Sequence, residues 1–276
     1  MSILFLGTAS GAGKTTVAAM YCRHLYRKGA RVAPFKALNL SLNSFVTPEG
    51  KEIGMGQAFQ AWASGIEPSG DMNPALLKPS GNGKIQLVLG GAPAGETSRD
   101  SPMDFRRVMG EACAAFDRLS AGHAVVCEGS GSPVELNLMH RDVANLGMMR
   151  ERSVPAVLVG DIERGGAFAA LYGTWLLTPD DLKPLLKGFI INRFRGDAKI
   201  LEGGIRRIEE LTGMRFLGVL PYARLKFPEE DSLSDSGGDL RGSSAMEAFI
   251  GNIDALLEMA ESSGLDFAGL DEISGY

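Results

Sequence analysis

The sequence predicts an α/β fold, a doubly wound and mostly parallel sheet with helices on both faces. Short apolar segments alternate along the chain with helical patterns, which is the order of parallel strands joined by helices. A glycine-rich turn at residues 7–16 separates the first apolar segment from the first helical pattern. Polar residues directly follow several apolar segments, and doubly wound folds bind their ligands at such strand ends.

The individual elements follow from apolar runs and from apolar spacing. Runs of mostly apolar residues predict strands at 3–6, 31–35, 85–89, 124–127, 154–159, 189–191 and 216–220. Helical spacing of apolar residues predicts helices over 17–25, 54–64, 102–120 and 245–262. Asp71-Met72-Asn73-Pro74 is typical of a turn. Because helices separate most of these strands, we expect the strands to pair in one parallel sheet.

The turn at Gly7–Thr16 has the pattern of a phosphate-binding loop. Such a loop presents backbone N–H groups and a helix N-terminus to a polyphosphate. We expect Lys14 to reach the outer phosphates and the Thr15 hydroxyl to ligate Mg²⁺. The glycine of the general pattern is replaced by Thr8 and stands one position earlier. The residues expected to bind nucleotide here are Thr8, Gly11, Ala12, Gly13, Lys14, Thr15 and Thr16.

Charged residues follow three of the predicted strands. Glu128 directly follows the segment 124–127. A P-loop protein carries the second carboxylate that organises Mg²⁺ at such a strand end. Lys36 follows the second strand and is expected to contact a phosphate or a substrate carboxylate. Asp161 follows the segment 154–159 and has two interpretations, a catalytic or ammonia-site role, or a cap of the helix that starts near Gly165.

A segment with alternating polar residues follows Lys36. Asn39, Ser41 and Asn43 occupy every second position there, past the end of a strand, so we expect them to face a substrate. Gln57 and Gln60 lie three apart on one helix face, and whether they line the same cleft is left open.

Composition and charge limit the classes of function. The chain has 276 residues, 45% apolar and 22% charged, which is typical of a globular protein. From Glu229 onward it carries 12 acidic residues and one basic one, which leaves 21 acidic and 27 basic residues upstream. A moderately basic body suits anionic ligands. No dense basic patch with interleaved aromatics predicts nucleic-acid binding.

Compartment and domain organisation are also expected from the sequence. No apolar run approaches the roughly 18 residues of a membrane span, and no signal peptide is recognised. Cys22, Cys113 and Cys127 lack metal-binding spacing, so we expect reduced thiols in a cytoplasmic protein. The expected organisation is a nucleotide-dependent domain over 1–230, a Ser-, Gly- and Asp-rich linker over 231–244, and an acidic tail with a short helix over 245–276.

Together these motifs resemble the N-terminal synthetase half of the cobyric acid synthase family, in the dethiobiotin-synthetase-like branch of P-loop proteins. The matching stretches run in family order over about residues 3–233: 7–16, 32–37 with 39 and 41–44, 71–74, 77–79, 128–133, 141–142, 159–161 with 164–166, 187–189, 192, 194–197 and 228–232. Three positions depart from the family pattern, which has an acid at Gly11, Gln at Leu38 and Lys at Arg193.

The resemblance implies ATP- and Mg²⁺-dependent amidation of peripheral carboxylates on a corrinoid or related tetrapyrrole, through an acyl phosphate. It implies catalytic roles for Lys14, Lys36 and Asp161, and metal binding by Thr15 and Glu128. The substrate is expected to face Asn39, Ser41, Asn43 and Arg164, and the dethiobiotin-synthetase branch implies that Asn192 reads the adenine.

The nitrogen source is expected to lie outside this chain. The family continues into a glutaminase domain with a cysteine nucleophile, whereas no cysteine follows Cys127 here. Free ammonia or a separate glutaminase subunit would supply the nitrogen, and a homodimer is left open.

Three alternative functions are considered for this sequence. A P-loop switch ATPase would carry a lysine early in the loop, which is absent. Dethiobiotin synthesis does not explain residues 39–44 and 71–74. A degenerate corrinoid-binding paralogue stays open because of Leu38 and Gly11.

Overall fold

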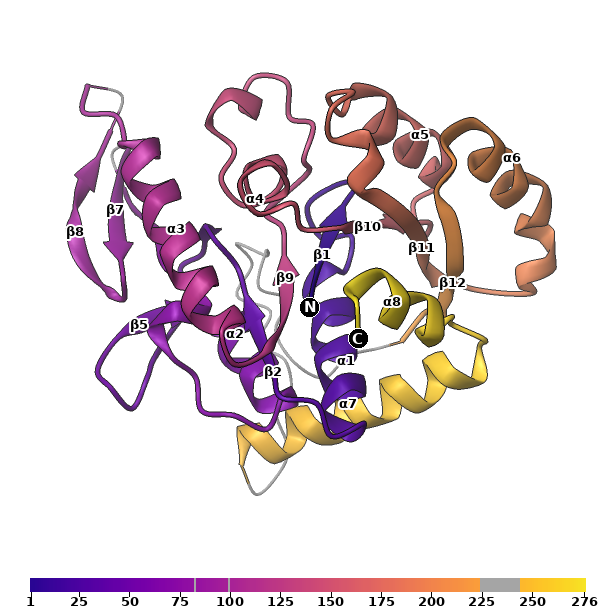
Figure 1. Cartoon of the computed structure of the whole chain (residues 1–276), viewed down its shortest axis with the longest axis horizontal. Helices are drawn as coiled ribbons and strands as arrows, with labels where there is room; N and C mark the ends of the chain where they lie inside the picture. The colour runs from indigo at the N-terminus through magenta and orange to yellow at the C-terminus, as the bar shows by residue number, and fades with distance from the viewer. Residues whose placement is uncertain (82, 99, 224–243) are drawn as a thin grey trace.

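A parallel sheet lies at the centre of the computed structural model, which describes residues 1–81, 83–98, 100–223 and 244–276 (Figure 1). Within these residues the sheet has six strands in the order β12-β11-β10-β1-β9-β2. They are β1 Ser2–Gly7, β2 Val32–Phe35, β9 Ala124–Glu128, β10 Ala156–Asp161, β11 Leu186–Phe194 and β12 Arg215–Pro221. The chain leaves β1 in one direction to reach β2 and β9, and in the other to reach β10, β11 and β12. The predicted doubly wound fold is confirmed.

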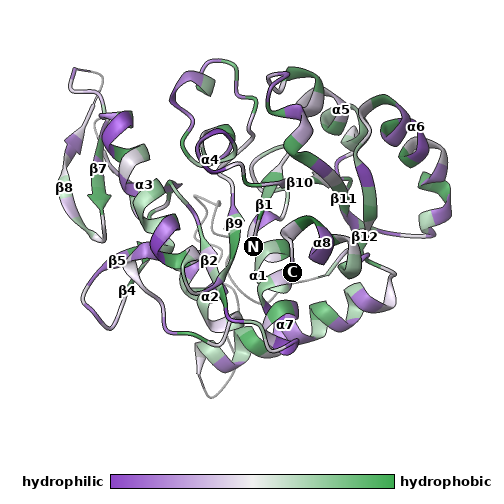
Figure 2. Cartoon of the chain, viewed as in Figure 1, coloured by the Kyte–Doolittle hydropathy of each residue, from purple (hydrophilic) through white to green (hydrophobic). Residues whose placement is uncertain are grey.

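Helices cover both faces of this sheet. One layer holds α1 Lys14–Arg27, α2 Met55–Ala63, α7 Ala245–Ser262 and α8 Phe267–Ser274; the other holds α3 Phe105–Ser120, α4 Leu146–Arg152, α5 Ala167–Leu177 and α6 Glu202–Thr212. Alternate residues of β1 serve the two layers, since Ile3 and Phe5 pack in the first and Leu4 and Leu6 in the second. Hydrophobic residues dominate β1 and β9, whereas α6 mixes them with hydrophilic ones (Figure 2).

A second sheet lies beside the first and is mainly antiparallel. It has the order β3-β6-β7-β8, with β3 Asn39–Leu40, β6 Ala75–Gly81, β7 Lys84–Leu89 and β8 Ala92–Thr97. The hairpin β4 Ser44–Val46 and β5 Glu52–Gly54 lies between β3 and β6 in the chain. The predicted strand 85–89 forms as β7, but the expectation that it joins the parallel sheet is wrong. Gly90 and Gly91 have φ of +59° and +79°, which makes a tight hairpin turn and pairs β7 with β8.

Most predicted element boundaries are close to the observed ones. The helix expected from residue 102 begins at Phe105, because the Asp104 carboxylate accepts hydrogen bonds from the backbone N–H groups of Arg106 and Arg107. The turn predicted at 71–74 overlaps a short 3-10 helix, η1 Gly70–Met72. The further 3-10 helices are η2 Met139–Arg141, η3 Lys183–Leu185 and η4 Ala198–Leu201.

The C-terminal helices dock on the main domain. Helix α7 has the predicted bounds and contacts α1, α2 and β12. Phe249 of α7 stacks on Phe59 of α2 with ring centroids 4.8 Å apart, and Asp254 pairs with Arg23 of α1. The domain boundary at 230 stays a prediction. Except for Ser244, which caps α7, the predicted linker lies outside the described residues, as does the motif at 228–232.

Across the described ranges, no helix combines the length and the apolar character that crossing a bilayer requires.

Candidate active site

The glycine-rich loop connects the end of β1 to the start of α1. Gly11 and Gly13 have φ of +71° and +95°, a backbone conformation that favours glycine. The side chain of Lys14 is buried and lies over the loop, where its Nζ donates to the Ala9 carbonyl at 3.2 Å. The loop therefore surrounds its own lysine and directs the first N–H groups of α1 toward the same space, as anion binding requires.

The carboxylate of Glu128 is the centre of a buried polar network. Its Oε1 accepts hydrogen bonds from Thr15 Oγ1 and Lys36 Nζ, both at 2.8 Å. Its Oε2 accepts from Gln60 Nε2 at 2.6 Å and from Gln57 Nε2 at 3.3 Å. The side chain of Glu128 is 0% exposed. Residues from α1, α2 and the ends of β2 and β9 thus meet at one carboxylate.

The network fits a magnesium ion that is held mainly by nucleotide phosphates. Thr15 and Glu128 present a hydroxyl and a carboxylate oxygen to the same point. In the part of the chain that the structure describes, no group of three or more His, Cys, Asp or Glu side chains could hold a metal. Mg²⁺ typically takes one or two protein oxygens and completes its shell with phosphates and water, which agrees with this donor set.

Asn192, at the end of β11, contacts the backbone of the loop. Its Nδ2 donates to the Ala12 carbonyl at 2.9 Å, and its Oδ1 accepts from the N–H of Arg193. A Cβ added at Gly13 would lie 2.1 Å from Asn192 Nδ2, so this contact depends on a glycine there. Adenine recognition by Asn192 stays a prediction. Thr8 connects the loop to β10 through its N–H and the carbonyl of Val159.

Asp161 is the last residue of β10, and Arg164 follows that strand. Asp161 accepts a hydrogen bond from the N–H of Glu163 and pairs with Arg193 Nη1, both at 2.9 Å. The alternative that Asp161 caps α5 is wrong, because that helix begins at Ala167 with Gly166 in the cap position. Arg164 is exposed and lies outside the cavity described next.

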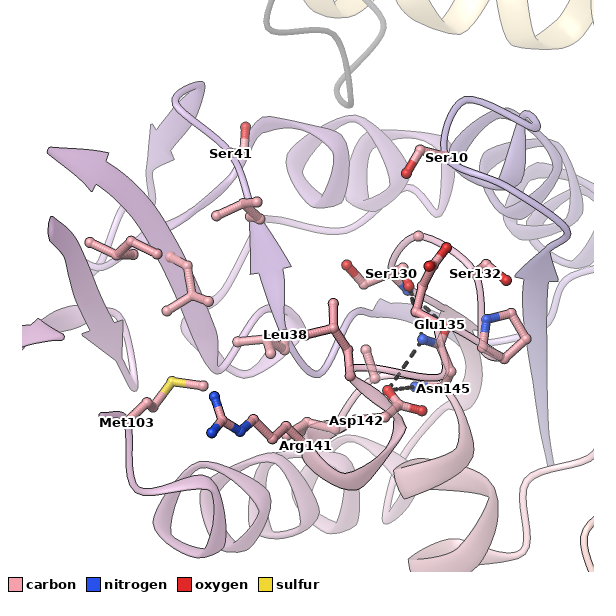
Figure 3. Close-up of a pocket in the computed structure, with 18 of the residues that line it drawn as sticks. Ser10, Leu38, Ser41, Met103, Ser130, Ser132, Glu135, Arg141, Asp142 and Asn145 are labelled. Carbon is pink, nitrogen blue, oxygen red and sulfur yellow. Dashed lines mark hydrogen bonds between the residues drawn. The ribbon is translucent and has the colours of Figure 1, made fainter. Parts of the chain in front are cut away.

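A cavity of about 700 Å³ opens beside the loop and reaches the second sheet (Figure 3). Its walls come from Ser10, from residues 38 and 40–43, from β6 and β7, from the start of α3 and from the segment that follows β9. The lining residues are Ser10, Leu38, Leu40, Ser41, Leu42, Asn43, Leu77, Pro79, Ile85, Met103, Phe105, Ser130, Gly131, Ser132, Pro133, Glu135, Leu138, Met139, Arg141, Asp142, Val143, Ala144 and Asn145.

The predicted substrate residues do not lie at one place, and Arg164 lies outside both the cavity and the carboxylate network. Ser41 and Asn43 line the cavity. Asn39 is buried instead, and its Nδ2 lies 3.5 Å from Gln57 Oε1. Gln57 and Gln60, whose place was left open, contact Glu128 and do not line the cavity.

The segment 135–145 forms one wall of the cavity and was not predicted to be part of the site. Asp142 lies there and accepts hydrogen bonds from the N–H groups of Asn145 and Leu146 at the start of α4. Burial raises the pKa of Asp142, and the hydrogen bonds from residues 145–147 oppose that rise. Asn145 in turn donates to the Ser130 carbonyl at 2.8 Å and accepts from the Ser130 N–H. The only signal in the sequence was the match at 128–133 and 141–142.

Comparison with known proteins gives one family and a set of close relatives. Residues 3–233 match the model described as CbiA, the CobQ/CobB/MinD/ParA nucleotide binding domain. The chain is 51% identical over 236 residues to the "Probable cobyric acid synthase" of Methanoculleus marisnigri, which covers 85% of this chain and 48% of that protein. The chain is also 51% identical over 240 residues to the protein of the same name from Archaeoglobus fulgidus, and that match covers 84% of this chain and 51% of that protein. The chain spans about half the length of the curated relatives it matches.

Solved structures are similar only at a distance. The MinD cell division protein of Aquifex aeolicus aligns with 93% of this chain and 96% of its own, at 13% identity and a TM-score of 0.46. A similarity at this level has no bearing on function.

Proposed function

Because the chain belongs to the family of CobQ/CobB/MinD/ParA nucleotide binding domains, we propose that it binds ATP at its P-loop and uses it to amidate carboxylates of a corrinoid. The relatives that are about half identical to it are named as probable cobyric acid synthases, and this chain spans about half of each. The observation that carries the proposal is the position of the cavity, because Ser10 of the P-loop forms part of its wall. A substrate in the cavity would meet the outer phosphate of a nucleotide in the loop.

The first step of the proposed reaction makes the carboxylate reactive. A carboxylate oxygen attacks the γ-phosphorus of ATP, the bond from that phosphorus to ADP breaks, and an acyl phosphate forms. Both reactants are anions, so the protein must position them and neutralise their charge. Lys14 and Lys36 supply positive charge near the loop. A bound Mg²⁺, held by the Thr15 hydroxyl and the Glu128 carboxylate, would neutralise charge on the phosphates.

The second step forms the amide. Ammonia attacks the carbonyl carbon of the acyl phosphate, the bond to phosphate breaks, and the nitrogen loses a proton. All three cysteines of the sequence are buried, and burial raises the pKa of Cys22 to about 12 and also raises the pKa of Cys113 and Cys127. Inert thiols of this kind cannot release ammonia from glutamine. We therefore propose that the ammonia is supplied from outside residues 1–276.

The test supplies the chain with ATP, Mg²⁺, ammonium and a corrinoid a,c-diamide, and follows the mass of the corrinoid. Successive amidations that disappear in the Lys14→Ala variant are the expected result. Corrinoid binding without amidation would favour a degenerate paralogue. If neither occurs and ATP instead drives dimerisation, the chain is a switch and the proposal is wrong.

A further inference from the structure

The cavity contains one side-chain cation. Among its lining residues in the described parts of the chain, Arg141 is the only basic one, while Glu135 and Asp142 are acidic. We propose that Arg141 binds a second, non-reacting carboxylate of the substrate and so holds the reacting carboxylate at the P-loop. This inference rests on the proposed function, since it names the feature of the substrate that the same cavity selects.

The Arg141 guanidinium lies away from the P-loop, where the proposed reaction takes place. In Figure 3 its side chain runs along the cavity toward Met103, and its guanidinium lies on the opposite side of the cavity from Ser10 of the P-loop. The guanidinium carbon lies 5.6 Å from the ring centroid of Phe105, over the face of that ring. A ligand that reaches both Ser10 and Arg141 must therefore span the cavity.

Arg141 is fixed at its backbone and exposed at its side chain. It ends the short helix η2, where its N–H donates to the Leu138 carbonyl at 2.8 Å. The next residue, Asp142, accepts the first N–H groups of α4 and fixes the chain on the other side. No carboxylate of the described residues forms an ion pair with the Arg141 side chain. The geometry therefore presents a positioned guanidinium to whatever enters the cavity.

The surroundings strengthen binding of a carboxylate at this point. The cavity walls are largely apolar, with Leu77, Ile85, Met103 and Phe105 among their residues, and the Arg141 guanidinium lies over the Phe105 ring. A guanidinium binds a carboxylate through two parallel charge-assisted hydrogen bonds, and a substrate that fills the cavity would strengthen them by excluding water. An amide or an ester at the same place keeps the shape but loses the charge. The site should therefore prefer a rigid, largely apolar molecule with carboxylates on well-separated edges.

The two acidic residues of the cavity do not neutralise the Arg141 guanidinium. Asp142 is engaged by the start of α4, as described above. Figure 3 draws Glu135 beside Ser130 and Ser132, away from the Arg141 guanidinium. Negative charge on that side opposes a bound carboxylate unless Lys14, Lys36 and a bound Mg²⁺ offset it. Anchoring at the far side by Arg141 lowers the cost of holding the reacting group there.

The test compares two ligands and three variants without ATP. Binding of a corrinoid with free peripheral carboxylates and of its fully methyl-esterified form is measured by titration calorimetry on Arg141→Met, Arg141→Lys and the control Arg150→Ala. Arg150 lies on the surface of α4, outside the cavity. We expect Arg141→Met to weaken binding of the carboxylate form about 10- to 100-fold and binding of the ester less than about twofold. Arg141→Lys should recover part of the loss and Arg150→Ala should match the unchanged chain.

Turnover and salt provide two further readouts. Arg141→Met should raise the KM for the corrinoid and leave kcat nearly unchanged, because the anchor contributes equally to ground state and transition state. Higher salt should reduce the difference between the unchanged chain and the variant. Equal weakening for both ligands, or none, overturns the anchor and leaves the corrinoid assignment standing. If the unchanged chain binds neither ligand, the corrinoid assignment fails and the anchor fails with it.

Discussion

Lys36 Nζ lies 2.8 Å from Glu128 Oε1, and the two side chains are 1% and 0% exposed. They meet because β2 and β9 pair in register, with Phe35 opposite Cys127, so that Lys36, which follows β2, lies beside Glu128, the last residue of β9. A buried pair of this kind compensates two charges that have been removed from water. Neither partner can be neutralised alone without leaving the other charge buried.

The first prediction concerns this pair. We expect Lys36→Met to lower the free energy of unfolding by about 3–5 kcal/mol, because the Glu128 carboxylate loses its cation while it stays buried. Urea denaturation followed by circular dichroism measures the change. The double variant Lys36→Met with Glu128→Gln should recover most of the loss, since both charges are then removed.

A matched pair on the surface provides the control. Lys84 and Glu96 are 3.2 Å apart and more than half exposed, so Lys84→Met should cost less than about 1 kcal/mol. Equal losses for Lys84→Met and Lys36→Met would contradict the role of burial.

The second prediction concerns the amide that orients Glu128. Gln60 Nε2 donates to Glu128 Oε2 at 2.6 Å and lies 3.3 Å from the Thr15 carbonyl. Gln60→Leu removes the shortest contact of that oxygen, so the carboxylate is less well oriented for Mg²⁺. We expect about 10-fold more Mg²⁺ to be needed for half-maximal ATP turnover. Gln57→Leu, which removes a 3.3 Å contact, should have a smaller effect. A weakening of metal-free nucleotide binding of the same size would point to a general loss of structure instead.

The main sheet could be predicted because its signals are local. Each strand of that sheet is a short apolar run, and in β2 and β9 a polar residue of the site lies at or directly after the strand end. Glu128 and Lys36 were therefore expected near the phosphates, and the structure brings them together with Thr15. Alternation of strands and helices then sufficed for the doubly wound fold.

The second sheet and the remaining residues of the site depend on which elements pack against each other, and a single sequence does not contain that information. Residues 85–89 predict a strand but not its partner, so the second sheet was missed. Gln57 and Gln60 share a helix face, but their target is defined only when α2 packs beside the end of β9. Arg141 lies in a segment without periodicity, and nothing local indicates that it faces a cavity.

The third prediction uses two glycines of one loop. Both have positive φ, but a Cβ at Gly13 would lie 2.1 Å from Asn192 Nδ2, whereas no described atom lies within 4 Å of a Cβ at Gly11. Gly11→Ala should cost only the backbone strain of about 1 kcal/mol. Gly13→Ala should also displace Asn192 from the Ala12 carbonyl and weaken nucleotide binding by at least about 10-fold. Titration with a fluorescent ATP analogue measures both variants, and equal affinities would contradict the expectation.

The last prediction concerns acid stability and the docking of α8. Asp271 accepts hydrogen bonds from Lys28 at 2.7 Å and Tyr21 at 3.0 Å, and lies 3.2 Å from His24 Nε2. Tyr21 and His24 are on α1, and Lys28 is its C-cap residue. Burial raises the pKa of Asp271, but the bonds from these three residues lower it more, so the pKa lies below its ordinary value of 3.8. The unfolded chain therefore takes up this proton first as the pH falls.

It follows that the charged form of Asp271 stabilises the folded chain fully above pH 3.8, and that this stabilisation is lost as the pH falls through the lower folded-state pKa. Asp271→Asn removes the group that titrates, so its free energy of unfolding should be lower than that of the unchanged chain at pH 6, and the difference should shrink toward pH 2. Urea denaturation at several pH values measures this. Lys28→Gln should give an intermediate result, because one of the bonds that lower the pKa of Asp271 is lost while the carboxylate remains. A difference between Asp271→Asn and the unchanged chain that stays constant with pH would show that the contribution of Asp271 to the docking of α8 on α1 does not come from its charge.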